Sequence, residues 1–323
     1  MKAVVLHKTG KPEVLSIREV PIPEVIPGWV LVKVRAFGIN RSELMMRQFE
    51  GNASYINLPR IIGIECAGEI VDPSDSRFRK GQKVVALMGG MGRTFNGSYS
   101  EYALLPEKNV FTIDTNLDWT EIGAIPETYF TAYGSLFDSL QIKTGDKFFV
   151  RGGTSALGLA AIQMARSVGA TVLASTRKES NINFLEAQGA EYVLVDDGTL
   201  PQQLLSSFPL GVNKILDLIG PSTLLESLKL SAYHGIVCST GMLGKKGSLN
   251  IFDPIKDIPN GVYLTGFFSN YPNQKIIDEI FNLIRTYNLH PVIAKVFSFD
   301  DIVSAHNMAE GNEANGKIEI RID

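Results

Sequence analysis

The chain has 323 residues, 45% of them hydrophobic and 20% charged, with a formal net charge of −3. This length exceeds the size at which a single hydrophobic core stops growing, and the composition excludes a disordered or fibrous chain, so we expect two compact domains. The slightly acidic balance argues against nucleic acid or a membrane surface as a partner, and without a signal peptide or an apolar run of about 18 residues we expect a cytoplasmic protein.

The first part of the chain, from Met1 to about Trp119, contains short runs that alternate apolar and polar residues between glycines and prolines. The run 31–36 is the clearest, because every second residue can face a core while Lys33 and Arg35 face water. Further strands are expected over 14–20, 64–71, 82–87 and 99–105. Several strands without long helices predict an antiparallel, barrel-like unit.

After Trp119 the pattern changes to an alternation of helices and strands. A helix is expected over 120–140, followed by strands over 147–150, 171–175, 192–195, 214–218, 236–239 and 262–267 with amphipathic stretches between them. Such alternation predicts right-handed βαβ crossovers and a doubly wound α/β domain with a parallel sheet.

The tail from 268 onward is too short to bury a core of its own. It contains a helix over 276–287, a strand over 292–297, a helix over 300–310 and a strand over 317–322. We therefore expect it to complete the first domain. The domains are predicted as 1–119 with 268–323, and 120–267.

A loop of small residues follows the strand 147–150 and opens the next helix. A diphosphate at such a loop meets the free N–H groups of the helix's first turn and the positive end of its dipole. Small side chains let the backbone approach the phosphates, and Gly158 lets helix and strand pack closely. The predicted cofactor-binding residues here are Gly152, Gly153, Thr154, Ser155, Ala156 and Leu157.

The next strand indicates which dinucleotide binds. An NAD site usually has Asp or Glu about 20 residues beyond the glycines, to hold the ribose hydroxyls. Here Ser175, Thr176, Arg177 and Lys178 stand at that place, and hydroxyls with two cations suit the 2′-phosphate of NADPH. The alternative is that the two cations are an ordinary solvated helix start.

Two further loops are expected at the same carboxyl end of the sheet, 218–220 and 239–241. In the second loop, Thr240 and Gly241 are predicted to contact the cofactor. The alternative is that the glycines serve only as turn residues.

Five segments together resemble the medium-chain dehydrogenase/reductase family, in its zinc-independent, quinone oxidoreductase-like form. They are AFGINRSE at 36–43, GIECAG at 63–68, GSYSEY at 97–102, FTAY at 130–133 and RGGTSALG at 151–158, the last followed by LAA. The resemblance implies a Rossmann domain together with a GroES-like, β-rich catalytic domain. Zinc-dependent relatives place a cysteine ligand where this chain has Asn40 and a histidine where it has Ile64, so no metal site is expected.

Without a Lewis acid, the acceptor of the hydride must itself be electrophilic, such as a quinone or an α,β-unsaturated carbonyl. The resemblance places Asn40 and Thr131 beside the nicotinamide and the substrate. Tyr55 corresponds in position to a proton-donating tyrosine of some enoyl reductases; an ordinary loop tyrosine, with the proton coming from solvent, is the alternative. The apolar strand 262–267, at an expected sheet edge, favours a homodimer, as in relatives.

Three functions remain open on this basis. The leading prediction is an NADPH-dependent quinone or enone reductase. An enoyl-thioester reductase is the alternative enzyme, and a non-catalytic NADPH-binding sensor or structural protein is the alternative class. The physiological acceptor, and one- against two-electron quinone reduction, are left undecided because substrate pockets are built from variable loops.

Overall fold

A computed structural model describes residues 1–244, 247–312 and 314–322 of the chain. By their contacts the residues form two compact units, Met1–Phe130 with Ser269–Asp323, and Thr131–Phe268. The C-terminal tail thus packs with the N-terminal part. The first boundary lies inside helix α3 (Pro126–Tyr133), so residues 120–130 belong to the first unit and not to the nucleotide-binding unit to which the sequence assigned them.

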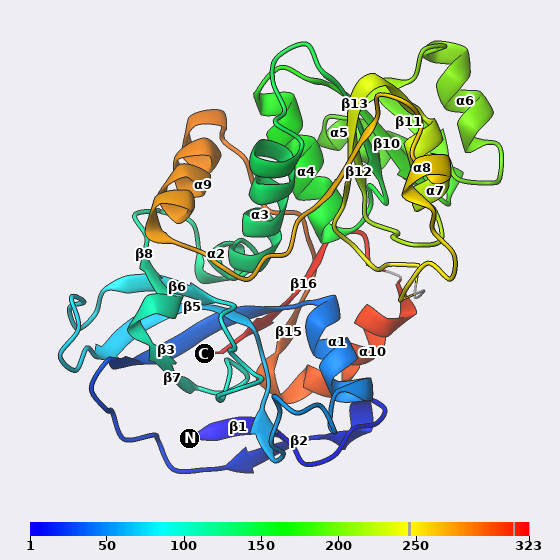
Figure 1. The fold of residues 1–323 in the computed structure, drawn as a ribbon. Coiled ribbons are helices and arrows are strands. Elements are labelled where there is room, and N and C mark those ends of the chain that lie inside the picture. The colour runs from blue at the N-terminus through cyan, green and yellow to red at the C-terminus, as the bar shows by residue number, and fades with distance from the viewer. Residues whose placement is uncertain (245–246, 313, 323) are drawn as a thin grey trace. The chain divides into compact units, whose positions relative to one another are not determined.

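The first unit is built mainly from antiparallel strands (Figure 1). A three-stranded sheet has the order β2-β1-β4, and a seven-stranded sheet has the order β15-β16-β3-β5-β6-β8 with β7 also pairing with β3. Among the described strands of this unit, the one parallel pair is β15 with β16, both from the tail. The strands are β1 (Lys2–Leu6), β2 (Leu15–Glu19), β3 (Trp29–Ile39), β4 (Arg60–Ile61), β5 (Glu65–Asp72), β6 (Lys83–Leu87), β7 (Tyr102–Pro106), β8 (Val110–Thr112), β15 (Ile293–Ser298) and β16 (Lys317–Arg321).

In the first unit, helices pack against a hydrophobic core that is formed by the inward-facing residues of the strands. Phe37 on β3 stacks on Tyr99 with ring centroids 4.4 Å apart, and the Tyr99 hydroxyl lies 3.0 Å from Nε2 of buried His306 on α10. Cys66 on β5 is a buried free thiol in this core. The helices are α1 (Arg41–Phe49), α2 (Trp119–Gly123), α9 (Gln274–Tyr287) and α10 (Ile302–Gly311), with short 3₁₀ turns η1 (Pro12–Val14), η2 (Glu107–Asn109) and η5 (Phe299–Asp301).

The second unit contains a six-stranded, fully parallel sheet of order β11-β10-β9-β12-β13-β14. This is the order 3-2-1-4-5-6 of a doubly wound dinucleotide-binding domain, which confirms the predicted fold class. Figure 1 shows helices on both sides of this sheet. The elements are β9 (Lys147–Arg151), α4 (Ala156–Ser167), β10 (Thr171–Thr176), η4 (Glu179–Asn181), α5 (Ile182–Gln188), β11 (Tyr192–Val195), α6 (Leu200–Ser207), β12 (Val212–Asp217), α7 (Leu224–Lys229), β13 (Ser231–Ser239), α8 (Pro254–Asp257) and β14 (Tyr263–Gly266).

The single helix predicted over 120–140 is wrong, because this stretch consists of three helical pieces. Helix α2 ends at Gly123, α3 begins at Pro126, and a π-helical segment η3 covers Gly134–Ser139. A proline has no N–H to continue a helix and disfavours helical backbone in the residue before it, so Pro126 starts a new helix. The π-helical turn begins at Gly134, against which the Phe267 ring packs so closely that a Cβ would lie 2.0 Å from it.

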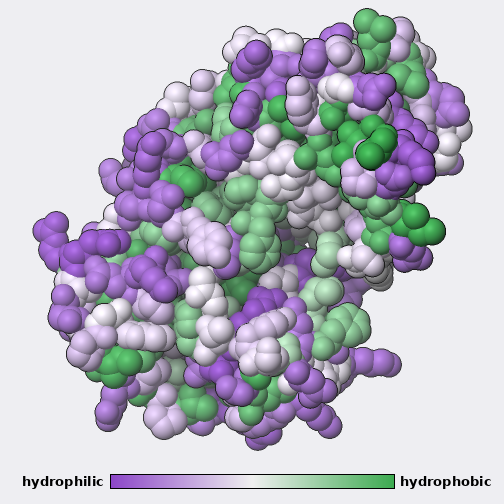
Figure 2. Space-filling model, in the orientation of Figure 1, coloured by the Kyte–Doolittle hydropathy of each residue, from purple (hydrophilic) through white to green (hydrophobic). Residues whose placement is uncertain are grey.

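Strand β14 is an edge strand of the parallel sheet, as the sequence predicted, and it pairs with β13 on one side only. Tyr263 on this strand is 56% exposed. Ile251 and Ile255, just before and within α8, are 86% and 91% exposed, and hydrophobic atoms gather around the position of α8 in Figure 2. Among the described residues, no helix is long and apolar enough to cross a membrane.

Candidate functional site

The small-residue loop forms a turn that opens directly into α4. Gly152 has a φ of +96°, a backbone conformation that favours glycine. Ser155 is the N-cap of α4: its Oγ accepts from the N–H of Gly158 (3.1 Å) and donates to the Gly152 carbonyl (2.8 Å). The N–H groups of Ala156 and Leu157 precede the first hydrogen bond within the helix, so they are available to an anionic ligand.

Close backbone approach explains why the loop needs small residues. A Cβ on Gly158 would lie 2.5 Å from the Gly152 carbonyl oxygen and 2.9 Å from Gly153 Cα. A Cβ on Gly153 would lie 3.0 Å from Ala174 Cβ on β10. Thr154, at the centre of the turn, is partly exposed. The loop therefore fits the requirement of a diphosphate cradle, in which nothing holds the backbone away from the phosphate oxygens.

The residues at the end of β10 place hydroxyl groups beside the loop 152–157, which we call the cradle, and two cations at its exposed edge. The Ser175 hydroxyl oxygen accepts from the N–H of Gly152 (3.1 Å), and Thr176 Oγ1 accepts from the N–H of Lys178 (3.2 Å). Both hydroxyl residues are nearly buried, whereas Arg177 and Lys178 are exposed. Among the described residues, neither cation forms an ion pair. No carboxylate stands between Ser175 and Lys178, where an NAD site has one.

The two loops after β12 and β13 pack against each other and against the cradle. A Cβ on Gly241 would lie 2.2 Å from the Leu218 carbonyl oxygen, and Gly152 faces Leu218 and Ile219. Thr240 Oγ1 lies 3.0 Å from Ser135 Oγ and 3.2 Å from Cys238 Sγ. The structure thus gathers the sequence-predicted residues of four neighbouring strands at one end of the sheet.

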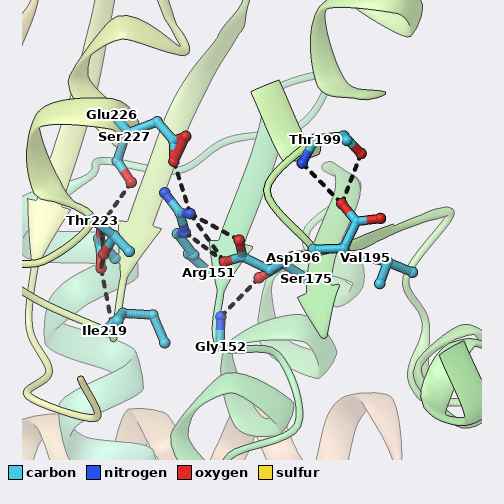
Figure 3. Close-up of polar contacts among 12 residues, drawn as sticks. Arg151, Gly152, Ser175, Val195, Asp196, Thr199, Ile219, Thr223, Glu226 and Ser227 are labelled. Carbon is cyan, nitrogen blue, oxygen red and sulfur yellow. Dashed lines mark hydrogen bonds and ion pairs between the residues drawn. The ribbon is translucent and has the colours of Figure 1, made fainter. Parts of the chain in front are cut away.

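A buried polar cluster beneath the cradle was missed by the sequence analysis. Arg151, the last residue of β9, is 3% exposed, and its guanidinium contacts the carboxylates of Asp196 (3.0 Å) and Glu226 (2.9 Å) (Figure 3). Its Nε and Nη2 bind the two oxygens of Asp196 in a bidentate arrangement. The sequence could not pair these charges, because Asp196 follows β11 and Glu226 lies in α7, and both are 45 or more residues from Arg151 in the chain.

Asp217, the last residue of β12, shapes the loop that follows it. Its fully buried carboxylate accepts from the N–H groups of Ile219 and Gly220, both at 2.9 Å, and from the hydroxyls of Thr223 and Ser227. The loop 218–220 is therefore held by a buried acceptor, since every oxygen of that carboxylate has several donors.

In the first unit, Asn40 lies at the start of α1 in a network of charged groups. Its Nδ2 donates to Glu65 Oε1 (2.7 Å), and its Oδ1 accepts from Lys317 Nζ (2.6 Å). Lys317 and Glu65 are an ion pair at 2.6 Å with exposures of 3% and 0%. Lys317 was not singled out by the sequence analysis, because alternating charged and apolar residues are typical of a strand with one solvent face, whereas the described residues Lys317 to Ile320 of β16 are all buried.

The Glu43 side chain holds the turn that contains Asn40. Its carboxyl accepts from the N–H groups of Asn40 and Ile64, both at 3.0 Å. Burial is the main reason why the pKa of Glu43 is raised to about 7, although the hydrogen bond from the Ile64 N–H opposes the shift. The turn that carries Asn40 is therefore tied to the strand that carries Glu65.

The two other predicted catalytic residues lie in different surroundings. Thr131 is 7% exposed and lies in α3, at the first position of the second unit. Tyr55 is 50% exposed, in the irregular segment between α1 and β4. The burial of Thr131 is compatible with a fixed hydrogen bond to a bound cofactor. The exposure of Tyr55 is compatible both with a proton-donating role and with an ordinary loop tyrosine.

By the resemblance, Asn40 and Ile64 stand at the positions of two zinc ligands in zinc-dependent relatives. The ammonium of Lys317 contacts Asn40 and Glu65 there, and neither an isoleucine nor an ammonium can ligate a metal ion. Across 1–244, 247–312 and 314–322, no group of three or more His, Cys, Asp or Glu residues could hold a metal ion.

Comparisons with known proteins agree with this two-part architecture. The family model described as "Alcohol dehydrogenase GroES-like domain" matches residues 26–115, and the one described as "Zinc-binding dehydrogenase" matches residues 156–285. The solved structure of the quinone oxidoreductase from Coxiella burnetii has a TM-score of 0.86 at 24% identity, and the match covers 100% of this chain and 99% of that chain. This likeness shows the fold.

Curated relatives extend the match to almost the whole chain. The "Quinone oxidoreductase" of Homo sapiens is 29% identical over 329 residues, covering 98% of this chain and 97% of its own length. The "Quinone oxidoreductase" of Rattus norvegicus is 30% identical over 259 residues, covering 78% of this chain and 75% of its own length. The chain therefore belongs to the medium-chain dehydrogenase/reductase family of nicotinamide-dependent oxidoreductases and is quinone oxidoreductase-like within it.

Proposed function

We propose that this protein is an NADPH-dependent oxidoreductase that transfers hydride, without zinc, to a quinone or an α,β-unsaturated carbonyl compound. The observation that carries the proposal is the cradle at Gly152–Leu157, with open N–H groups at the start of α4 and backbone contacts that exclude a larger side chain. Bound NADPH would supply the hydride, and the chain's own residues would bind and orient the two reactants.

The preference for NADPH is supported by the charges at the end of β10. Arg177 and Lys178 are exposed and have no carboxylate partner among the described residues, so both can bind a doubly charged 2′-phosphate. Thr176 and Ser175 add hydroxyl groups beside them. A carboxylate that would favour the free ribose hydroxyls of NADH is absent from these four positions.

Reduction without zinc is supported by the residues around Asn40. A catalytic zinc needs three suitable protein ligands and an open position, whereas here an asparagine, an isoleucine and a lysine ammonium surround the place. An acceptor that is already electrophilic needs only orientation and a hydrogen-bond donor for the negative oxygen that develops on hydride addition. The names of the relatives, quinone oxidoreductases, support a quinone as one such acceptor.

We assign the roles of the predicted catalytic residues on the same basis. Asn40 would donate a hydrogen bond to the acceptor oxygen, and Thr131 would bind the nicotinamide carboxamide. In the overall reaction a quinone takes one hydride from NADPH and one proton, giving a hydroquinone and NADP⁺. Tyr55 or solvent would supply the proton.

The test is NADPH oxidation by the purified protein with a panel of quinones, alkenals and enoyl thioesters, with and without a chelator. The proposal expects turnover of quinones or enones that the chelator does not reduce. Turnover of enoyl thioesters alone would identify the alternative enzyme. Tight NADPH binding with no turnover of any acceptor would favour a sensor or structural protein, and activity abolished by the chelator would contradict the zinc-free mechanism.

We also propose a homodimer that pairs through β14. The strand leaves one edge of the parallel sheet unpaired, and its Tyr263 is exposed. Light scattering should give twice the chain mass of 35.4 kDa for the native protein and a reduced mass for Tyr263→Lys. Tyr192→Lys, on the opposite edge strand β11, is the matched control and should remain dimeric; a native monomer would contradict the proposal.

A further inference from the structure

A buried lysine uses all of its hydrogen-bonding capacity on groups around Asn40. Nζ of Lys317 donates to Asn40 Oδ1 (2.6 Å), to Glu65 Oε1 (2.6 Å) and to Thr128 Oγ1 (2.9 Å). An ammonium has three N–H donors and no acceptor, so none remains for a ligand. Lys317 is also only 3% exposed. It therefore acts on its neighbours and does not itself touch a substrate.

The partners of Asn40 determine which way its carboxamide points. The lysine can only donate, so the atom 2.6 Å from it must be the amide oxygen. The Glu65 carboxylate can only accept, so the atom 2.7 Å from it must be the amide nitrogen. A flipped amide would place N–H groups against the ammonium and an oxygen against the carboxylate. The hydrogen-bonding capacity of the two partners therefore fixes which end of the Asn40 carboxamide is the oxygen and which is the nitrogen.

The surrounding packing holds this network rigidly. Glu65 Oε2 accepts from the N–H of Glu127 (2.7 Å), so both oxygens of this carboxylate are engaged. On the neighbouring strand, a Cβ on Gly38 would lie 2.1 Å from Lys317 Cε and 2.6 Å from Glu65 Oε1. Little space remains for the lysine or the carboxylate to move, so the amide of Asn40 is held by fixed partners.

The ionisable groups around Asn40 differ in charge. Burial lowers the pKa of Lys317, but the adjacent Glu65 carboxylate outweighs burial and the net shift is upward, so the ammonium persists. Burial raises the pKa of Glu319 well above its usual range, and neither of its oxygens has a hydrogen-bond partner among the described residues, so this carboxyl is neutral. The Lys317 ammonium and the Glu65 carboxylate therefore contact opposite ends of the Asn40 amide, while Glu43, with its pKa raised to about 7, contacts the Asn40 backbone N–H.

We propose that Lys317 is a positioning residue that, with Glu65, fixes the orientation of the Asn40 amide so that a side-chain N–H serves as the hydrogen-bond donor. The proposal rests on the proposed function and adds the residues that position its donor. One N–H of the partly exposed Asn40 remains unused and can stabilise the oxyanion formed when hydride adds to a quinone or an enone. The amide oxygen of Asn40 already accepts from the Lys317 ammonium, so the group that Asn40 presents to an acceptor is an N–H donor. This arrangement suits an acceptor whose oxygen gains negative charge when hydride adds.

The test uses Lys317→Met, Asn40→Ala and the corresponding double variant. If Lys317 acts through Asn40, each single variant lowers kcat with the best quinone or enone by at least about tenfold, and the double variant is no slower than Asn40→Ala. KM for the acceptor and Kd for NADPH stay within about twofold. Unchanged kcat in Lys317→Met, or losses that multiply in the double variant, would overturn the proposal. Lys295→Met, an exposed lysine on the adjacent strand β15, is the matched control.

A second variant guards against simple misfolding. Lys317→Met with Glu65→Gln removes both charges together, which avoids leaving one buried charge unpaired. It should fold and still show the loss of kcat, because a glutamine can face either end of the Asn40 amide.

An activity-independent measurement separates this proposal from the proposed function. In side-chain ¹H–¹⁵N spectra, identified by comparison with Asn40→Ala, one N–H of Asn40 should exchange slowly in the native protein and both should exchange fast in Lys317→Met with Glu65→Gln. Identical exchange in both proteins would overturn the positioning role. A native protein that turns over no quinone or enone would instead contradict the proposed function, whatever the exchange shows.

Discussion

The substitution Gly158→Ala sets two effects of opposite sign against each other. Gly158 lies in the first turn of α4, where alanine is the better helix former by about 1 kcal/mol. However, a Cβ there would lie 2.5 Å from the Gly152 carbonyl oxygen and 2.9 Å from both Gly153 Cα and the Gly153 carbonyl oxygen. These are backbone atoms of the cradle and have no rotamer by which to move away.

The close contact should outweigh the gain in helix propensity. Overpacking of this kind costs about 1–3 kcal/mol, so the free energy of unfolding should fall by up to about 2 kcal/mol. Because the displaced atoms belong to the cradle, the phosphates should also lose at least one charge-assisted hydrogen bond, worth about 1.5–3 kcal/mol. That loss corresponds to a rise of roughly 10- to 100-fold in the Kd for NADPH.

The assay combines urea unfolding with calorimetric titration of NADPH. Gly247→Ala is the control, since a Cβ at that position meets no atom within 4 Å and its φ is not in the left-handed region. The control should leave both the free energy of unfolding and the Kd nearly unchanged. If Gly158→Ala instead raised the stability and left the Kd for NADPH unchanged, the assignment of this turn as a diphosphate cradle would be refuted.

Three further predictions concern single side chains. Arg177→Ala should raise the Kd for NADPH by roughly tenfold or more and leave that for NADH unchanged, with Lys275→Ala as the control; an unaltered preference would refute the 2′-phosphate assignment. Burial lowers the pKa of His306 to about 3, so the folded protein keeps it neutral while the unfolded chain binds a proton below its usual value of 6.5. The stability of the native protein relative to His306→Gln should therefore fall by about 1.6 kcal/mol between pH 6.5 and pH 5, as chemical unfolding at each pH would reveal, and a pH-independent difference would contradict the buried neutral imidazole. Tyr55→Phe should lower kcat several-fold if the hydroxyl donates the proton; an unchanged kcat would leave that role to solvent.

Local patterns predicted much of the fold. In the second unit, short apolar runs end in glycine or polar residues, and the parallel strands β9, β10 and β11 were expected within a residue or two of their observed bounds. The phosphate-binding loop was predictable because its constraint is local: Gly152 and Gly158 are close in the chain as well as in space. Pro126 could have corrected the helix predicted over 120–140, since the rule that breaks it needs only the sequence.

The buried charges were not predictable in the same way. Lys317 and Glu65 are separated by 252 positions, and Arg151 and Glu226 become neighbours only when β9 and α7 are packed. A period-two pattern places Lys317 and Glu319 on a solvent face, because such a pattern cannot tell whether a second layer covers that face. The partners that orient Asn40 therefore required the structure, while Asn40 itself came from a family resemblance.

The most direct measurement is isothermal titration of the native protein with NADPH and with NADH. The positive rim at Arg177 and Lys178, together with the open N–H groups of α4, predicts a Kd for NADPH at least about tenfold lower than that for NADH. Absence of heat with both coenzymes would contradict the dinucleotide site itself, and tighter binding of NADH would contradict the assignment of NADPH.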